Sequence, residues 1–175
     1  MRKNRKILGA AASALAAALV VVAVASGAAQ SRSVQVLDDC EAASFNAAIG
    51  PGTCVKDGGV TFSEFIDQLV TQGRAPAWRF SPEQLQLSAG GTLNAHNRGG
   101  EFHTLTEVAA FGGGCVPELN EILGLTPVPE CATPGIFGTT GIAPGGTLET
   151  APLAAGTHRF MCLIHPWMKT TATVG

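Results

Sequence analysis

The sequence predicts an all-β protein, a sandwich or barrel of short strands that follows one amphipathic helix. From Ala75 onward, apolar residues recur at every second position in runs that proline and glycine separate. The 175 residues include 22 glycines and 10 prolines, a turn-rich composition that suits one small domain. We therefore divide the chain into an N-terminal signal over 1–29, an extension over 30–75 and a sandwich over 76–175.

The first 29 residues have the pattern of an export signal peptide. A basic cluster over residues 2–6 precedes an uncharged apolar run from Ile7 to about Ala25, and small residues follow. We prefer cleavage before Gln30, but the apolar run approaches the length that spans a bilayer, so an uncleaved anchor stays open. In both cases the rest of the chain is expected outside the cytoplasm, periplasmic or secreted.

The charge balance of the exported part argues against polyanionic partners. From Gln30 onward the chain has seven basic and thirteen acidic residues, a net charge of −6. Nucleic acids and anionic membrane surfaces attract basic clusters, and this part of the chain has none. We expect a monomer that inserts into no membrane unless the N-terminal segment is retained.

Residues 30–75 predict an irregular lead-in followed by one helix. Turn signals such as Gly50-Pro51-Gly52 fill residues 30–60. The segment TFSEFIDQLVTQG then begins with Thr61 and Glu64 in capping-box spacing and ends at Gly73. Its apolar residues share one helical face, which we expect to pack on the sandwich: Phe62, Phe65, Ile66, Leu69 and Val70.

Six segments after residue 75 predict strands, and one long insertion interrupts them. The strands are expected within 77–87, 92–97, 101–111, 146–153, 156–164 and 169–174, as in an antiparallel sandwich or barrel. Residues 112–146 form the insertion, in which PELNEILG predicts about two helical turns with Pro117 near the start and Gly124 at the end. So long a loop needs a brace or a function.

The five cysteines leave one without a disulfide partner. Four cysteines allow three pairings, and we prefer Cys40 with Cys54 and Cys115 with Cys131, because each closes a loop of about 15 residues worth roughly 3 kcal/mol. This pairing braces the insertion and leaves Cys162 alone. In an oxidising compartment a lone cysteine is free, intermolecular or bound to a metal.

The stretch HRFMCLIHPWM, residues 158–168, predicts most of a metal site. Cys162, His165 and Met168 follow one another at intervals of three, so a tight turn can direct all three inward. His103, in a strand after NRGG, is the natural fourth ligand. Two imidazoles, one thiolate and a weak thioether suit a mononuclear type 1 copper centre.

Here the sequence resembles the cupredoxin family, in particular plastocyanin, pseudoazurin and amicyanin. The resemblance rests on GTHRFMCLIHPWMKTTATV and on NRGGEFHT, and it spans about Trp78 to Val174. It implies a Greek-key β-sandwich with His103, Cys162, His165 and Met168 as copper ligands. It also implies that electrons enter and leave at His165, and that the backbone N–H of Thr104 faces the thiolate.

Other metal chemistries fit the sequence less well. A structural zinc site rarely uses methionine. A binuclear copper centre needs a second cysteine in the ligand loop, where Leu163 and Ile164 stand, and multicopper oxidases need paired His-x-His motifs. We assign no ligand role to His96, His158 or Met161, the last because it alternates with Cys162 along a strand.

The sequence thus predicts an exported copper protein that transfers single electrons between redox partners. The alternative is a copper carrier or buffer without redox turnover, and a third hypothesis is a structural or interaction module. A catalytic enzyme is not expected, because no acid, base or substrate pocket can be named. The partner is expected to be another redox protein that docks near IHPWM and the insertion.

Overall fold

A computed structural model of the chain describes residues 30–175, and the predicted signal peptide lies outside the described residues. The strands are β1 Ser31–Leu37, β2 Arg79–Ser81, β3 Gln84–Leu87, β4 Thr92–Asn97, β5 His103–Thr104, β6 Thr106–Val108, β7 Gly141–Ile142, β8 Thr147–Glu149, β9 Gly156–Met161 and β10 Lys169–Val174. The helices are α1 Ala42–Ala48, α2 Phe62–Gln72, α3 Pro117–Leu123 and α4 Ile136–Thr140, with a 3₁₀ turn at Pro129–Ala132.

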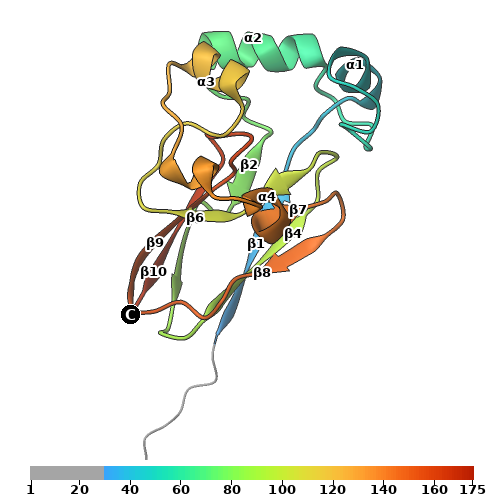
Figure 1. The fold of residues 1–175 in the computed structure, drawn as a ribbon. Coiled ribbons are helices and arrows are strands. Elements are labelled where there is room, and N and C mark those ends of the chain that lie inside the picture. Colours follow the sequence, from blue (N-terminus) through green and yellow to red (C-terminus); the bar gives the residue numbers. More distant parts are fainter. Residues whose placement is uncertain (1–29) are drawn as a thin grey trace, which may run out of the picture.

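The strands form the predicted sandwich, with helices gathered at one end. One sheet has the order β2-β1-β4-β8, the other β3-β10-β9-β6, and β5 pairs separately with β7. In Figure 1 the helices α1, α2 and α3 lie across the upper end of the sandwich, opposite the C-terminus. Inward side chains of both sheets make the main core, which includes Val34, Val36, Phe80, Leu93, Phe160 and Ala172.

The sheets are mixed, which corrects the antiparallel arrangement that the sequence suggested. β1 runs parallel to β4, with Val34 opposite Ala95, and β10 runs parallel to β3. The other pairings are antiparallel, including the β9–β10 hairpin that carries the C-terminal motif. The two parallel pairs join segments far apart in the chain, so no local turn signal announced them.

Residues 30–60 are not the irregular lead-in that we predicted. Val34 and Val36 are fully buried on one side of β1, so this strand lies inside the sandwich rather than in a separate extension. A second helix, α1, follows it, and the Glu41 carboxylate accepts hydrogen bonds from the N–H groups of Ala43 and Ser44 at its start. The structure therefore replaces one extension with one helix by a sandwich strand and two helices.

Helix α2 begins and ends as predicted. Thr61 and Glu64 form the capping box, and Gly73 ends the helix with a φ of 68°, a left-handed conformation that glycine adopts readily. Phe65 and Leu69 are buried against the sandwich. Val70, which we placed on the same apolar face, is 67% exposed, because the contacting stripe is narrower than the sequence pattern.

Both preferred disulfides are present, and the insertion is braced as predicted. Cys40 is bonded to Cys54 and Cys115 to Cys131, and Cys162 is the free cysteine of residues 30–175. Within the insertion, α3 begins at Pro117 and ends at Gly124. The Cys115 N–H donates to the Leu163 carbonyl at 2.6 Å, which ties the insertion to the loop after β9.

Among residues 30–175, no helix combines the length and the apolar character needed to cross a membrane.

Candidate metal centre

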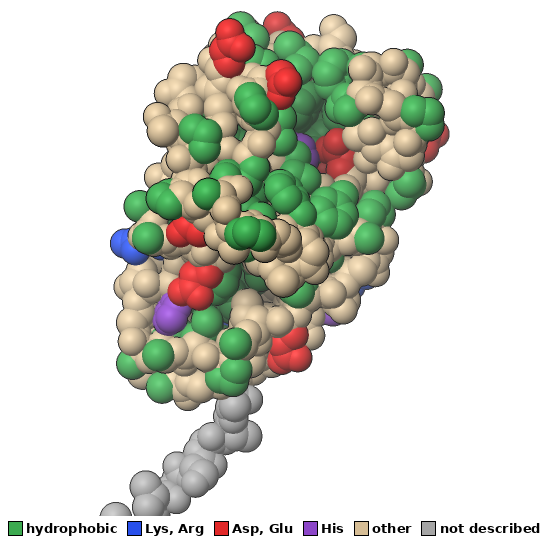
Figure 2. Space-filling view, in the orientation of Figure 1, with side chains coloured by type: hydrophobic (Ala, Val, Ile, Leu, Met, Phe, Trp, Pro, Cys, Tyr) green, Lys and Arg blue, Asp and Glu red, His purple; other side chains and the backbone are tan. Residues whose placement is uncertain are grey.

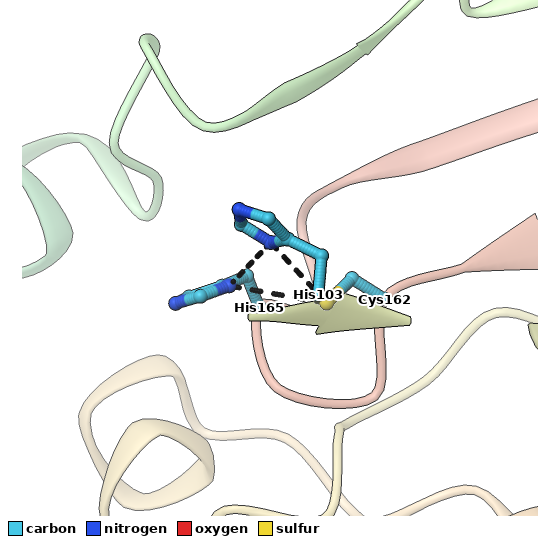
Figure 3. Close-up of side chains that lie close together, drawn as sticks. All are labelled: His103, Cys162 and His165. Atoms are coloured by element: carbon cyan, nitrogen blue, oxygen red, sulfur yellow. Dashed lines mark hydrogen bonds between the residues drawn. The ribbon is translucent and has the colours of Figure 1, made fainter. Parts of the chain in front are cut away.

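Three predicted ligands converge at the helix-covered end of the sandwich. His103 Nδ1 lies 3.2 Å from His165 Nδ1, and Cys162 Sγ lies 3.8 Å from each of these nitrogens (Figure 3). Ligands about 2.0 Å (nitrogen) and about 2.3 Å (sulfur) from one ion, spread by about 120°, would lie about 3.5 Å and about 3.7 Å apart. The observed triangle therefore fits a single ion.

The loop between β9 and β10 places two of these ligands beside Met168. The Cys162 N–H donates to the Met168 carbonyl at 3.1 Å, and the Met168 N–H donates to the His165 carbonyl at 2.9 Å. Met168 is fully buried. The Cys-x-x-His-x-x-Met spacing thus forms one closed turn, as the sequence predicted.

A short strand and a tight turn place His103. β5 pairs with β7, which sets His103 opposite Ile142. In the preceding turn the Asn97 side chain donates to the Glu101 and Ile142 carbonyls. A Cβ on Gly99 would overlap the Asp38 carboxylate, so only glycine lets this turn pass so close to that side chain.

The Cys162 sulfur has the surroundings of a thiolate. The Thr104 N–H donates to Sγ at 3.4 Å, as the resemblance implied, and the Leu163 N–H donates to Thr104 Oγ1 at 2.8 Å. Burial would raise the pKa of the Cys162 thiol, but hydrogen bonds from His103 and His165 outweigh it and hold that pKa well below its usual range.

Asp38 is a site residue that the sequence analysis missed. Its Oδ2 lies 2.7 Å from His103 Nε2, and both side chains are fully buried. Burial would raise the pKa of Asp38, but the hydrogen bond and charge of His103 outweigh it and lower that pKa to about 2. Burial likewise opposes a charged His103, while Asp38 and Cys162 raise its pKa to about 9. This carboxylate orients the ring so that Nδ1 faces the cluster.

Glu101 is a second carboxylate that the sequence analysis missed. Its Oε2 accepts a hydrogen bond from Trp78 Nε1 and lies 3.6 Å from His165 Nε2. Burial raises the pKa of Glu101, although the neighbouring histidines and the Trp78 hydrogen bond partly oppose this. Each histidine of the cluster therefore directs Nδ1 at Cys162 and Nε2 toward a carboxylate. In the sequence, Asp38 is marked only by its place directly after β1. Glu101 is marked only by its place in the turn before His103.

Aromatic side chains cover His165, the ligand expected nearest to solvent. The imidazole centroid lies 5.4 Å from the Trp167 ring, 6.2 Å from Phe65 of α2 and 6.4 Å from Trp78. His165 is consequently only 4% exposed. Helix α2 and the two tryptophans thus shape the surface above the cluster.

The other candidates lie elsewhere. His158 Nδ1 is 2.6 Å from Glu107 Oε1 and its Nε2 is 2.9 Å from the Ala154 carbonyl oxygen, so neither ring nitrogen contacts the cluster. Met161 packs with Leu163 in a second, smaller core cluster, whereas Cys162 belongs to the main core. His96 is in β4 and is absent from the cluster.

Comparison with known proteins finds distant structural similarity only. No protein-family model and no curated protein matches the chain. Solved structures do: a purple cupredoxin from Nitrosopumilus maritimus (14% identity, 82% of this chain and 98% of that one, TM-score 0.43) and the oxidised plastocyanin of Dryopteris crassirhizoma (16%, 82% and 100%, TM-score 0.40). A third is a Cu(I) amicyanin mutant (18%, 55% and 73%, TM-score 0.36). The TM-scores of these three similarities lie between 0.36 and 0.43. This chain is similar to these proteins in architecture alone. At identities of 14 to 18%, the similarity transfers no residue role to this chain.

Proposed function

We propose that the protein binds one copper ion and transfers single electrons outside the cytoplasm. The ligands would be His103, Cys162 and His165, with Met168 as a fourth, weaker ligand. The observation that carries this proposal is the buried triangle of two Nδ1 atoms and one Sγ, all between 3.2 and 3.8 Å apart.

The donor set favours copper over zinc. Thiolate and imidazole together suit both oxidation states of copper. Met168 is fully buried in the same loop, and a methionine ligand is typical of type 1 copper sites but rare in structural zinc sites. Copper bound there would supply a one-electron couple. The residues hold the donors in place: Asp38 orients His103, the Thr104 N–H stabilises the sulfur charge, and Phe65 packs edge-on against His165.

Burial favours electron transfer over copper delivery. His103 and Cys162 are completely buried and His165 nearly so, which leaves an incoming acceptor protein no donor atom to exchange with. A carrier needs at least one accessible ligand to release its ion quickly. The copper carrier and the structural module are therefore the weaker hypotheses, and we propose no catalytic activity.

The two disulfides support the predicted extracytoplasmic location, because such bonds persist in oxidising compartments. The proposed partner is a redox protein.

Titration of the metal-free protein with Cu(II) tests the proposal. We expect one equivalent to bind and to give intense visible absorption from thiolate-to-copper charge transfer, which Cys162→Ser should abolish. Reversible voltammetry and slow copper loss to a chelator would support electron transfer. A colourless complex would contradict the type 1 site, and rapid copper loss would favour the carrier.

A further inference from the structure

A pocket of about 620 Å³ opens beside the cluster, between the helices and the sandwich. His165 and Glu101 belong to its lining, together with side chains of α1, α2 and α3. Figure 2 shows a hollow at this helical end, with histidine and acidic atoms inside it and apolar side chains around it. Its volume lies within the roughly 300–1,000 Å³ of small-molecule sites.

The pocket combines aromatic walls with one buried carboxylate. Phe45, Phe62 and Phe65 line it, and Ile49, Phe102 and Ile122, which also line it, are 55%, 39% and 38% exposed. Glu101 is only 5% exposed. Its Oε2 accepts a hydrogen bond from Trp78 Nε1. Its Oε1 accepts no hydrogen bond from any residue of the described chain, 30–175. A carboxylate that lines a pocket and has one oxygen without a hydrogen-bond donor can accept a hydrogen bond from a ligand.

The charges of the lining restrict the ligand further. Glu101 and Glu118 contribute carboxylates, and no lysine or arginine belongs to the lining. An anionic ligand would place its charge next to Glu101 without a compensating cation, which costs binding energy. A neutral aromatic molecule with a hydroxyl group satisfies both conditions.

From these observations we propose that the pocket binds a neutral aromatic alcohol of the phenol and hydroquinone class. Its ring lies among the phenylalanines, and its O–H donates to Glu101 Oε1. The bound molecule lies against the His165 side chain, on the side of the cluster that faces the surface. The sequence alone indicates no small-molecule pocket, because its walls come from five separate segments of the chain.

Ligand titration of the metal-free protein followed by ¹H–¹⁵N NMR tests this proposal without copper, so its outcome is independent of the proposed function. The probes are 2-naphthol, 2-methylnaphthalene without a donor, and anionic 2-naphthoate. We expect saturable shifts at Ala48 and Leu119 with 2-naphthol, at least tenfold weaker binding of 2-methylnaphthalene, and no saturation with 2-naphthoate. Equal affinities for the three probes, or no saturation with 2-naphthol, would overturn it.

A matched pair of variants locates the site. Ala48 lines the pocket and is exposed, so Ala48→Trp should fill the opening and weaken 2-naphthol binding at least tenfold. Ala47, the preceding residue of α1, is also exposed but lies outside the lining, so Ala47→Trp should leave the affinity unchanged. Equal losses in both variants, or none in either, would show that 2-naphthol binds elsewhere.

Discussion

Replacement of Asp38 by asparagine should weaken copper binding without removing a ligand. The carboxylate accepts hydrogen bonds from the N–H groups of Gly100 (2.8 Å), Glu101 (3.1 Å) and Cys40 (3.3 Å), and it contacts His103 Nε2 at 2.7 Å. An asparagine places an NH₂ group where one oxygen stood. If that group faces His103, the ring can accept its hydrogen bond only through Nε2, which moves the ring proton to the metal-facing Nδ1.

The size of the effect depends on which way the new amide group faces. Loss of a carboxylate behind a metal-binding histidine typically costs 10–100-fold in affinity, which is about 1.4–2.7 kcal/mol. If the NH₂ group instead faces Gly100, a buried donor loses its acceptor and unfolding becomes easier by about 1–3 kcal/mol. Chelator competition measures the affinity, and ¹⁵N shifts of the His103 ring report its tautomer. Asp39→Asn, at the exposed neighbouring carboxylate, is the control. Unchanged affinity and tautomer in Asp38→Asn would refute the orienting role.

Three further predictions concern the stability of the fold and the packing of Phe65 over His165. Cys115→Ser combined with Cys131→Ser should lower the free energy of unfolding by about 3 kcal/mol in urea titrations, and an unchanged midpoint would contradict this. The pKa of His158 is raised, chiefly by its hydrogen bond to Glu107, so the pair stabilises the fold below about pH 6.5 and loses its effect as pH rises further. The stability difference to His158→Gln should thus be larger at pH 6 than at pH 9 and stay within about 0.5 kcal/mol; a difference that grows with pH would be wrong in sign. Phe65→Ala should cost about 3–5 kcal/mol and speed copper loss to a chelator, whereas unchanged loss would show that Phe65 does not cover His165.

Local patterns predicted the parts of the structure that depend on nearby residues. The Thr61 capping box, the two disulfides and the turn that joins Cys162, His165 and Met168 each involve partners less than twenty residues apart. Hydrogen-bonding and loop-closure rules act directly at that range. The sequence pointed to His103 over a longer distance because it follows NRGG in a predicted strand and because the resemblance to cupredoxins implied it.

The missed parts depend on contacts between distant segments. The alternation of Val34 and Val36 in SRSVQVL could have indicated β1, but the turn signals that follow it dominated the interpretation of residues 30–60. Nothing local distinguishes Asp38 from the other acidic residues, because its role arises only when β1 lies beside the turn before His103. Glu101 gains its role in the same way, from Trp78 and His165.

A crystal structure of the copper-loaded protein tests the central claim most directly. The account predicts one copper ion at bonding distance from His103 Nδ1, His165 Nδ1 and Cys162 Sγ, with the Met168 sulfur as a more distant neighbour and Asp38 still bonded to His103 Nε2. A copper ion bound elsewhere, or bound without Cys162, would contradict it.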